Sequence, residues 1–431
     1  MERSLYDTYV DILKTQLVPA MGCTEPIAVA YAAALAAKAL RKNETAGPAF
    51  VRHVHLSVSS NIIKNVKSVI VPNTGGLHGL EAAAAAGIVA GDPSKKLLVI
   101  SQVTDAQKEL IRDFLQEADF VVEESDSGEL FDILITLKSD SHTSQCRIAG
   151  SHTNVVRIAS DGTTELEKTL AAEANEEHSQ LEALQIKEIV EFADCVDIAH
   201  VKETLDRQNQ SNMDIAQEGL THAYGARIGQ VLLKARGDDP VTKARAYAAA
   251  ASDARMGGCE KPVVINSGSG NQGITASIPV IIYAEYLGST QEMLYRALVI
   301  SNLVTLHLKC GIGPLSAYCG AISAGCGAAA GVTYLYGGGF KEIAHTVVNA
   351  LAINSGVICD GAKASCAAKI ASAVEAGLLG MEMYRHGSQF HSGDGIVSKG
   401  VENTIRNVSQ LASQGMRKTD TEIIKIMLAQ T

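Results

Sequence analysis

The sequence predicts an α+β fold: a mainly helical domain, built from both chain ends (1–45 and 201–431), carries an inserted α/β domain (46–200). Two observations support this. Alternating apolar residues, typical of half-buried strands, occur between about residues 46 and 200. Beyond Glu203 these patterns almost vanish, and Ala- and Leu-rich helical patterns with Gly-rich joints continue to Thr431. The sequence contains no internal repeat and no low-complexity linker.

The N-terminal end is expected to form two helices. The first covers residues 2–17 and ends before Pro19 and Gly22. Its apolar stripe is formed by Leu5, Tyr9, Ile12 and Leu13. Thr24 is the expected N-cap of the second helix, because an acid and a proline follow it in the first turn. This helix continues through an Ala-rich run to Leu40.

The inserted domain is expected to alternate strands with helices. Strand patterns occur at 54–58, 133–137, 146–148 and 155–158. Helical patterns cover 79–89 and 105–117, and Ser160-Asp161-Gly162 is a turn signal.

Charge and composition exclude several classes of function. The chain has 431 residues, with 37 basic and 47 acidic side chains and a formal net charge of −10. Binding to nucleic acid or to an anionic membrane requires a basic surface, so neither is expected. The 46% hydrophobic content is enough for a large core, and with 38 Gly and no Trp that core is expected to pack backbones closely.

The cysteines and the N-terminus indicate a cytoplasmic protein. Met1–Leu5 lacks the basic-then-apolar layout of a secretory signal, and nine cysteines are too few for a disulfide scaffold. Reduced thiols are therefore expected. Residues 310–340 carry no charge, but Gly and Pro interrupt them and large apolar side chains are few. This favours a buried helix over a membrane span.

Cys23 is the first candidate for chemistry. It directly precedes the expected N-cap, where free N–H groups and the helix dipole stabilise a thiolate and lower its pKa. A cysteine that only fills space at a helix joint is the alternative, and both interpretations stay open.

Five of the nine cysteines gather in the C-terminal half: Cys310, Cys319, Cys326, Cys359 and Cys366. The tight spacings of zinc ribbons and ferredoxins are absent. Thiolates from separate loops could still hold an iron–sulfur cluster with one open iron. Small buried packing residues are the alternative.

Two polar, Gly-rich loops, 72–79 and 266–273, each lead into an apolar helix. Exposed N–H groups at such helix starts suit a carboxylate or phosphate, and ordinary capping turns are the alternative. Neither loop matches a nucleotide-binding motif, so a small carboxylate is favoured. The substrate contacts expected from these loops and from segment 61–67 are Asn61, Asn73, Thr74, Gly75, Ser267 and Ser269. Within residues 61–67, Lys64 and Lys67 are expected to be surface charges, and the alternative is that one of them reaches an anionic substrate. His307 and His345, on later apolar segments, are expected to be core histidines with partners.

Five segments, taken in order, carry a resemblance to a known family. They are Met21–Pro26, Ser267–Pro279, Tyr318–Cys326, Ile358–Cys366 and Gly415–Asp420. Together they resemble the L-cysteine desulfidases, relatives of the iron–sulfur L-serine dehydratase α chain, over nearly the whole chain.

The resemblance implies an oxygen-labile [4Fe–4S] cluster held by Cys319, Cys359 and Cys366. Cys319 is preferred to Cys310 as a ligand because the segment that starts at Cys319 matches the dehydratase ligand segment. In both, a second cysteine and the run Gly-Ala-Ala-Ala-Gly follow the ligand. Cys326 is that second cysteine, and the resemblance implies that it is not a ligand.

The resemblance also assigns roles in catalysis. Cys23 matches the catalytic cysteine of the desulfidases, and the loop around Asn271 matches one that lies near substrate. The implied reaction is β-elimination, in which L-cysteine and water give hydrogen sulfide, ammonia and pyruvate. The cluster would act as a Lewis acid, and a Cys23 thiolate of near-neutral pKa would take the Cα proton.

Two alternatives remain. The same scaffold could act on L-serine, as an ammonia-lyase of the serine dehydratase type, or the chain could be a non-catalytic amino-acid-binding protein whose thiols are core residues. A small amino acid is the expected partner, with no nucleic acid and no membrane, and a homodimer is considered.

Overall fold

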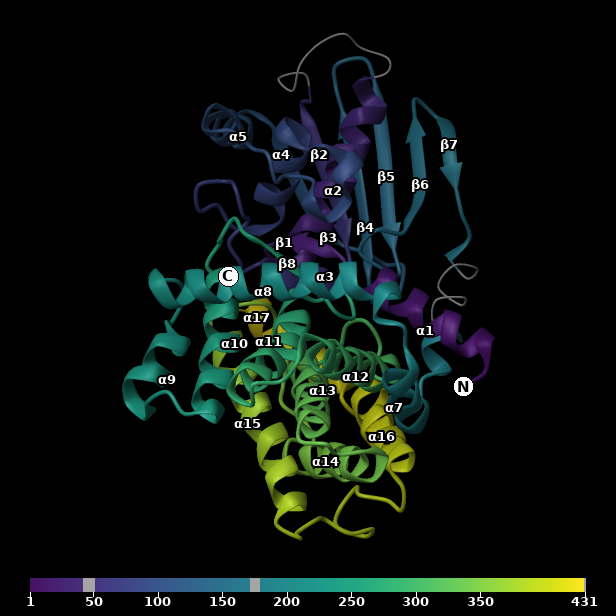
Figure 1. Ribbon diagram of the computed structural model, residues 1–431. Coiled ribbons are helices and arrows are strands. Elements are labelled where there is room, and N and C mark those ends of the chain that lie inside the picture. The colour runs from purple at the N-terminus through teal and green to yellow at the C-terminus, as the bar shows by residue number, and fades with distance from the viewer. Residues whose placement is uncertain (42–50, 171–178, 430–431) are drawn as a thin grey trace.

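The computed structural model describes residues 1–41, 51–170 and 179–429. It is an α+β structure, as the sequence predicts, with a sheet region and a helical region that meet along one side (Figure 1). Among the described residues, no helix is long and apolar enough to cross a membrane.

The sheet region is built on six strands of the described chain, in the order β3-β2-β4-β5-β6-β7. Strands β2 and β3 run parallel and the other neighbours are antiparallel. The strand bounds are His53–Val58 (β2), Asp119–Glu124 (β3), Asp132–Lys138 (β4), Thr143–Ala149 (β5), Val155–Ser160 (β6) and Thr163–Glu167 (β7). On β2 the predicted alternation is confirmed, because Val54, Leu56 and Val58 are buried.

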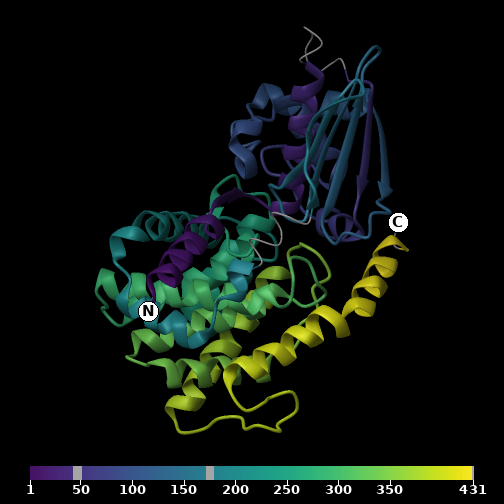
Figure 2. The ribbon, with the colours of Figure 1, turned by 90° about the vertical axis from the view of Figure 1, so that its right-hand side faces the viewer.

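Helices cover one face of this sheet, as Figure 2 shows in the turned view. Helix α2 (Thr24–Arg41) packs on β4, β5 and β6, and α4 (Gly79–Ala90) packs on α2. The two helix backbones approach closely, since a Cβ on Gly87 would lie 2.1 Å from the Ala30 carbonyl oxygen. Helix α5 (Asp105–Glu117) lies against α4.

The helical region contains the long helices of the C-terminal half. They are α8 (Lys202–Thr221), α9 (Ile228–Arg236), α10 (Pro240–Met256), α11 (Gly270–Tyr286), α12 (Gln291–Cys310), α13 (Gly320–Leu335), α14 (Phe340–Ile353), α15 (Cys366–Arg385), α16 (Val401–Gln410) and α17 (Arg417–Leu428). The described residues also form helices α1 (Arg3–Gln16), α3 (Ser60–Val66) and α7 (Ile186–Cys195), and short helical turns at Pro93–Leu98, Ile198–His200 and Leu411–Gly415.

Helix α13 forms the centre of the helical region, packed against α11, α12 and α15. It lies in the uncharged segment, which is the buried helix that the sequence predicts. Its glycines allow neighbours to approach: a Cβ on Gly325 would lie 2.5 Å from the Ala373 carbonyl oxygen. His307 contacts the Glu402 carboxylate at 2.7 Å and His345 stacks on Tyr384, so both have partners, as expected. Both are only partly buried and do not lie in the core.

The division into domains at residues 46 and 200 stays a prediction. The packing adds that α2, which precedes residue 46, lies on the sheet, and that α7, which precedes residue 201, packs on α12 and α14. A two-stranded pair joins the regions: β1 (Pro19–Met21) runs antiparallel to β8 (Pro262–Val264). This pair places the start of α2 beside the loop before α11.

Candidate active site

A cavity of about 110 Å³ lies where α2 begins, next to the loops that precede α11, α13 and α15. Residues from both chain ends line it. They include Cys23, Glu25, Asn65, Arg255, Ser269, Asn271, Gln272, Lys309, Tyr318, Cys319, Cys359, Gly361, Cys366 and Ile370.

The β1–β8 pair and a tight turn bring Cys23 to this cavity. Gly22 has a φ of +54°, and a Cβ there would lie 2.7 Å from Cγ of Pro72, so the turn requires glycine. The helix begins at Thr24, and the Ile27 N–H donates to the Cys23 carbonyl. Cys23 therefore takes the N-cap position that was expected of Thr24, whose hydroxyl donates to the Glu25 carboxylate.

The Glu25 carboxylate is the centre of a partly buried hydrogen-bond cluster. It accepts from the Cys23 thiol and the Thr24 hydroxyl at Oε2, each at 3.1 Å. Its Oε1 accepts from the Asn65 amide at 3.1 Å. Burial alone would raise the pKa of Glu25, but nearby His152 and the Cys23 hydrogen bond bring this pKa below its ordinary value. The carboxylate is therefore an acceptor at neutral pH.

The same contacts correct the expectation of a low pKa for Cys23. Burial, followed by the negative charge of Glu25, raises the pKa of this thiol well above its ordinary value, and the nearby Arg255 offsets only part of that rise. The resting group is a thiol that donates to a carboxylate, and the helix start does not make it a thiolate.

Three further cysteines face the cavity from two loops. Cys319 directly precedes α13, Cys366 is the first residue of α15, and Cys359 lies in the loop between α14 and α15. Two backbone hydrogen bonds align these loops: Cys319 N–H to Val357 O (2.8 Å) and Cys359 N–H to Ala317 O (2.7 Å). The cavity thus gathers thiols that are far apart in sequence. Neither Cys310 nor Cys326 lines it.

The three thiols differ in acidity. A hydrogen bond from Cys319, helped by the positive charge of Lys64, lowers the pKa of Cys359 to about 6 against the effect of burial. Cys319 has a pKa well above its ordinary value because it shares its proton with Cys359 and is buried. Burial also raises the pKa of Cys366. Cys359 is therefore the most acidic of the three thiols.

The donor set fits an iron–sulfur cluster. Thiolates are the ligands that such clusters take, and Lys64 and Lys369 lie close enough to Cys359 to favour its anionic form. Among the described residues, no three His, Cys, Asp or Glu side chains are arranged around a single metal ion. A cluster does not require that arrangement, because each thiolate binds a different iron. Which cysteines are ligands stays a prediction.

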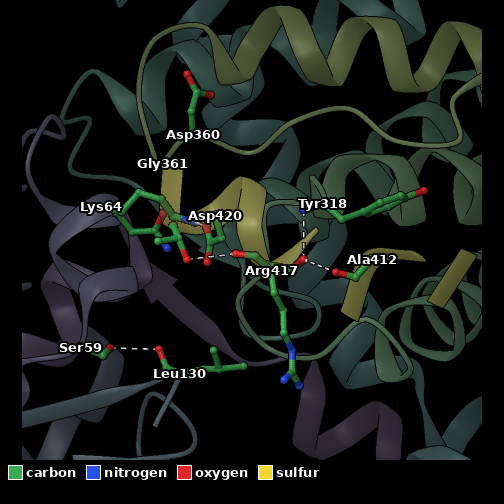
Figure 3. Close-up of polar contacts among 12 residues, drawn as sticks. Ser59, Lys64, Leu130, Tyr318, Asp360, Gly361, Ala412, Arg417 and Asp420 are labelled. Carbon is green, nitrogen blue, oxygen red and sulfur yellow. Dashed lines mark hydrogen bonds and ion pairs between the residues drawn. The ribbon is translucent and has the colours of Figure 1, made fainter. Parts of the chain in front are cut away.

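Lys64, Lys309 and Lys369 lie close to the cavity cysteines, and Lys64 is not the surface charge that the sequence predicts. Lys64 is only 2% exposed and pairs with Asp420 of α17, so it is not the surface charge that the sequence suggested (Figure 3). Lys309 is buried and donates to the Gly313 carbonyl, and burial lowers the pKa of its amine to about 8. Lys67 donates to the Met427 carbonyl at 2.8 Å.

The expected substrate contacts divide into two groups. Ser269 and Asn271 line the cavity. Asn61, Asn73, Thr74, Gly75 and Ser267 do not. The polar side chains of the first Gly-rich loop bond to the backbone: Asn73 donates to Ile100 O at 2.8 Å, and the Thr74 hydroxyl donates to Val71 O and accepts from Leu77 N–H. These hydrogen bonds hold the loop in its conformation. Pro72 of this loop packs against Gly22, so the loop also supports the turn before Cys23.

Sequence reasoning missed Arg255, Gln272 and the hydrogen-bonding role of Glu25. Arg255 lies in the last turn of α10, only 2% exposed, and its Nε has no hydrogen-bond partner among the described residues. Gln272 Oε1 and Asn271 Oδ1 are also buried without a partner in this part of the chain. The sequence signal that could have indicated Arg255 is an arginine within the Ala-rich run Tyr247–Met256. Such a run is expected to be buried, and a buried arginine usually has an anionic partner.

The pattern of a known family matches residues 94–425, and its description is "Serine dehydratase alpha chain". The matched range contains Arg255 and all three cavity cysteines of the C-terminal half. Cys23 and Glu25 lie before it.

Full-length relatives cover the remaining part. A UPF0597 protein of Desulfitobacterium hafniense is 55% identical over 437 residues, 100% of this chain and 99% of the relative. A UPF0597 protein of Lachnoclostridium phytofermentans is 45% identical, covering 98% of this chain and 100% of the relative. One of Treponema denticola is 42% identical, with 99% of each chain covered.

Proposed function

The chain belongs to the serine dehydratase alpha chain family, and on this premise we propose that it is an L-cysteine desulfidase. Such a carbon–sulfur lyase converts L-cysteine and water into hydrogen sulfide, ammonia and pyruvate. The observation that carries the proposal is the Cys23 thiol, which donates to the Glu25 carboxylate in the cavity that three other cysteines line. Such a thiol and carboxylate can move a proton beside a bound substrate.

In this proposal Cys319, Cys359 and Cys366 hold a [4Fe–4S] cluster. When bound, the cluster would supply an open iron as a Lewis acid for the leaving sulfur or the substrate carboxylate. The neighbouring Lys64 and Lys369 compensate the negative charge of the thiolates, which favours their ionised form.

The residues of the chain itself move the proton. Cys23 passes its own proton to Glu25 and, as a thiolate, takes the proton from Cα of the substrate. As the Cα–H bond breaks, its electrons form the Cα–Cβ double bond and the Cβ–S bond breaks. HS⁻ leaves and takes up the proton that Glu25 received, which returns Cys23 and Glu25 to their starting states. The enamine left behind becomes an imine, and water hydrolyses it to pyruvate and ammonia. Burial of Cys23 keeps bulk water from the thiolate.

L-Serine is the second candidate substrate, and the description of the matched family favours it. The two reactions differ only in the atom that leaves Cβ. Thiol and hydroxyl leaving groups can therefore be compared in the same cavity.

The test uses full-length protein reconstituted anaerobically with iron and sulfide. We expect about four irons per chain, sulfide and pyruvate in equal amounts from L-cysteine, and much slower pyruvate release from L-serine. Cys23→Ala is expected to keep the iron content and visible absorption but to lose sulfide release. Cys359→Ser is expected to lose the cluster. Cys326→Ala, which changes a buried cysteine outside the cavity, is the matched control and should keep both.

Two results would contradict the proposal. One is a wild-type protein that binds the cluster but releases pyruvate from neither amino acid. The other is full desulfidase activity in Cys23→Ala. Faster turnover of L-serine than of L-cysteine would favour the second candidate.

A further inference from the structure

The buried guanidinium of Arg255 has no assigned partner. It lines the cavity, its Nε has no hydrogen bond, and it forms no ion pair within the described residues. The Glu25 carboxylate is close enough for its pKa to respond to Arg255, but its oxygens bond to Cys23, Thr24 and Asn65 instead. A buried cation without hydrogen bonds is costly, so an anion is expected to complete this site.

The first turn of α11 lies against the same guanidinium. A Cβ on Gly270 would lie 2.3 Å from Arg255 Nε, so only glycine lets the arginine reach over the helix start. The N-cap residue Ser269 makes no side-chain capping bond. The N–H groups of the first turn are thus not capped by Ser269, and the helix dipole favours an anion at this place.

Two amides complete the surroundings. Gln272 is 5% exposed, lines the cavity and leaves Oε1 without a partner among the described residues, as Asn271 leaves Oδ1. These oxygens can only accept hydrogen bonds, so they suit an N–H donor such as the α-ammonium group. A positive fork with free N–H donors next to amide acceptors matches the two charged groups on Cα of a free amino acid.

We propose that Arg255 and the first turn of α11 bind the α-carboxylate of the substrate. The site thereby restricts the enzyme to free α-amino acids and presents Cα to Cys23. This inference rests on the proposed function and names the part of the substrate that is recognised. Because Arg255 electrostatically affects both Cys23 and Glu25, a carboxylate held there brings Cα close to the proton-transfer pair.

The test separates recognition from turnover. Binding of L-alanine, which has no leaving group, and of L-alaninamide, which lacks the carboxylate, is measured anaerobically by calorimetry on the reconstituted holoenzyme. L-Alanine is expected to bind and L-alaninamide is not. Arg255→Gln is expected to weaken L-alanine binding and to raise the KM for L-cysteine roughly 100-fold. Arg255→Lys is expected to show intermediate values for the L-alanine affinity and for the KM of L-cysteine, because lysine keeps the positive charge but lacks the two parallel N–H donors of the guanidinium.

Arg245→Gln is the matched control, an arginine on the same helix that pairs with Glu375 outside the cavity, and it should leave L-alanine binding unchanged. Equal binding of L-alanine and L-alaninamide by the wild type, or unchanged L-alanine affinity in Arg255→Gln, would overturn the inference. If the wild type turns over neither amino acid but binds L-alanine through Arg255, the proposed function fails and the carboxylate site stands. If Arg255→Gln does not fold, the comparison of the two ligands on the wild type still decides.

Discussion

At the residue scale, a carboxylate sets the state of Cys23 more than the helix that follows it. A negative charge 3.1 Å from Sγ would oppose a thiolate by about 5 kcal/mol at an effective dielectric constant near 20. A helix N-terminus stabilises an anion by at most about 2 kcal/mol. Burial and the carboxylate together therefore outweigh the helix, and the pKa of Cys23 rises although it sits at the start of α2. Any proton that leaves Cys23 has an acceptor already in contact with it.

This pair leads to a prediction for Glu25. Glu25→Gln keeps the shape and one acceptor oxygen but cannot take a proton, so we expect kcat for L-cysteine to fall about 10²- to 10⁴-fold with little change in KM. Steady-state sulfide release measures both constants. Thr24→Val removes only one hydrogen bond to the same carboxylate and should cost less than about tenfold. Wild-type kcat in Glu25→Gln would show that the carboxylate accepts no proton in the reaction.

Single residues were predictable from sequence where a local motif marked them. Cys23 and the later thiols stand in recognisable segments, and the structure gathers Cys23, Cys319, Cys359 and Cys366 at one cavity. Arg255 carries no local motif, because its meaning comes from Gly270, which tertiary packing places beside it. The predicted thiolate state of Cys23 was wrong because the sequence indicated the helix start but not the burial of the thiol or its hydrogen bond to Glu25.

At the element scale, helix starts form much of the cavity wall. Helices α2, α11, α13 and α15 all begin next to it. Glycine permits the closest approach, since a Cβ on Gly320 would lie 2.6 Å from Cδ of Gln272. The positive ends of these helix dipoles add to the charge of Arg255 and Lys309, so the cavity favours anionic groups.

The long helices and strands β2, β4, β5 and β6 were predictable because their apolar residues recur with a regular period. Strands β3 and β7 were not predicted, since most of their residues are polar or exposed. Strands β1 and β8 were not, because three residues show no period. The packing of α2 on the sheet was missed as well. An Ala-rich helix buried on nearly every side has no polar face to show which neighbour covers it.

Helix α16 provides a prediction at this scale that depends on pH. Glu402 accepts from the Ile186 N–H, at the start of α7, and contacts His307 of α12, so one carboxylate joins three helices. Burial opposes ionisation, but His307 and the Ile186 N–H bring the pKa of Glu402 below its ordinary value of 4.5. A carboxylate with a lowered pKa stabilises the fold above about pH 4.5, and this contribution is lost as the pH falls through its folded value.

Glu402→Gln should therefore lower the free energy of unfolding by about 1 kcal/mol at pH 7, because neutral hydrogen bonds replace charge-assisted ones. Urea unfolding of both proteins at pH 7, 5 and 4 measures the difference, which should persist at pH 5 and shrink at pH 4. A difference that is the same at all three values would contradict the role of the charge.

At the scale of the whole molecule, the end of the chain braces the cavity. Helix α17 extends from the helical region to a point beside the sheet (Figure 2). There Asp420 pairs with buried Lys64 of α3, and the Met427 carbonyl accepts from Lys67. Gly361, two residues after Cys359 and with a φ of +94°, packs on the carbonyl of Lys64, where a Cβ would lie only 2.4 Å away. The tail, α3 and the Cys359 loop therefore hold one another in place.

Asp420→Asn tests this arrangement. It removes the ion-pair partner of the buried Lys64 ammonium, and breaking a buried ion pair in this way costs about 3–5 kcal/mol. Because α17 has few other contacts, we expect part of that cost to appear as local detachment, seen as faster tryptic cleavage after Arg417 and Lys418 under native conditions. Glu422→Gln, on the same helix but paired with Lys425 at the exposed surface, should change stability by less than about 0.5 kcal/mol. Cleavage of Asp420→Asn at the wild-type rate, with unchanged urea unfolding, would mean that the Lys64–Asp420 pair does not hold the tail on α3. The detached tail should also lower the iron retained after reconstitution, since the Cys359 loop packs on the residue that Asp420 fixes.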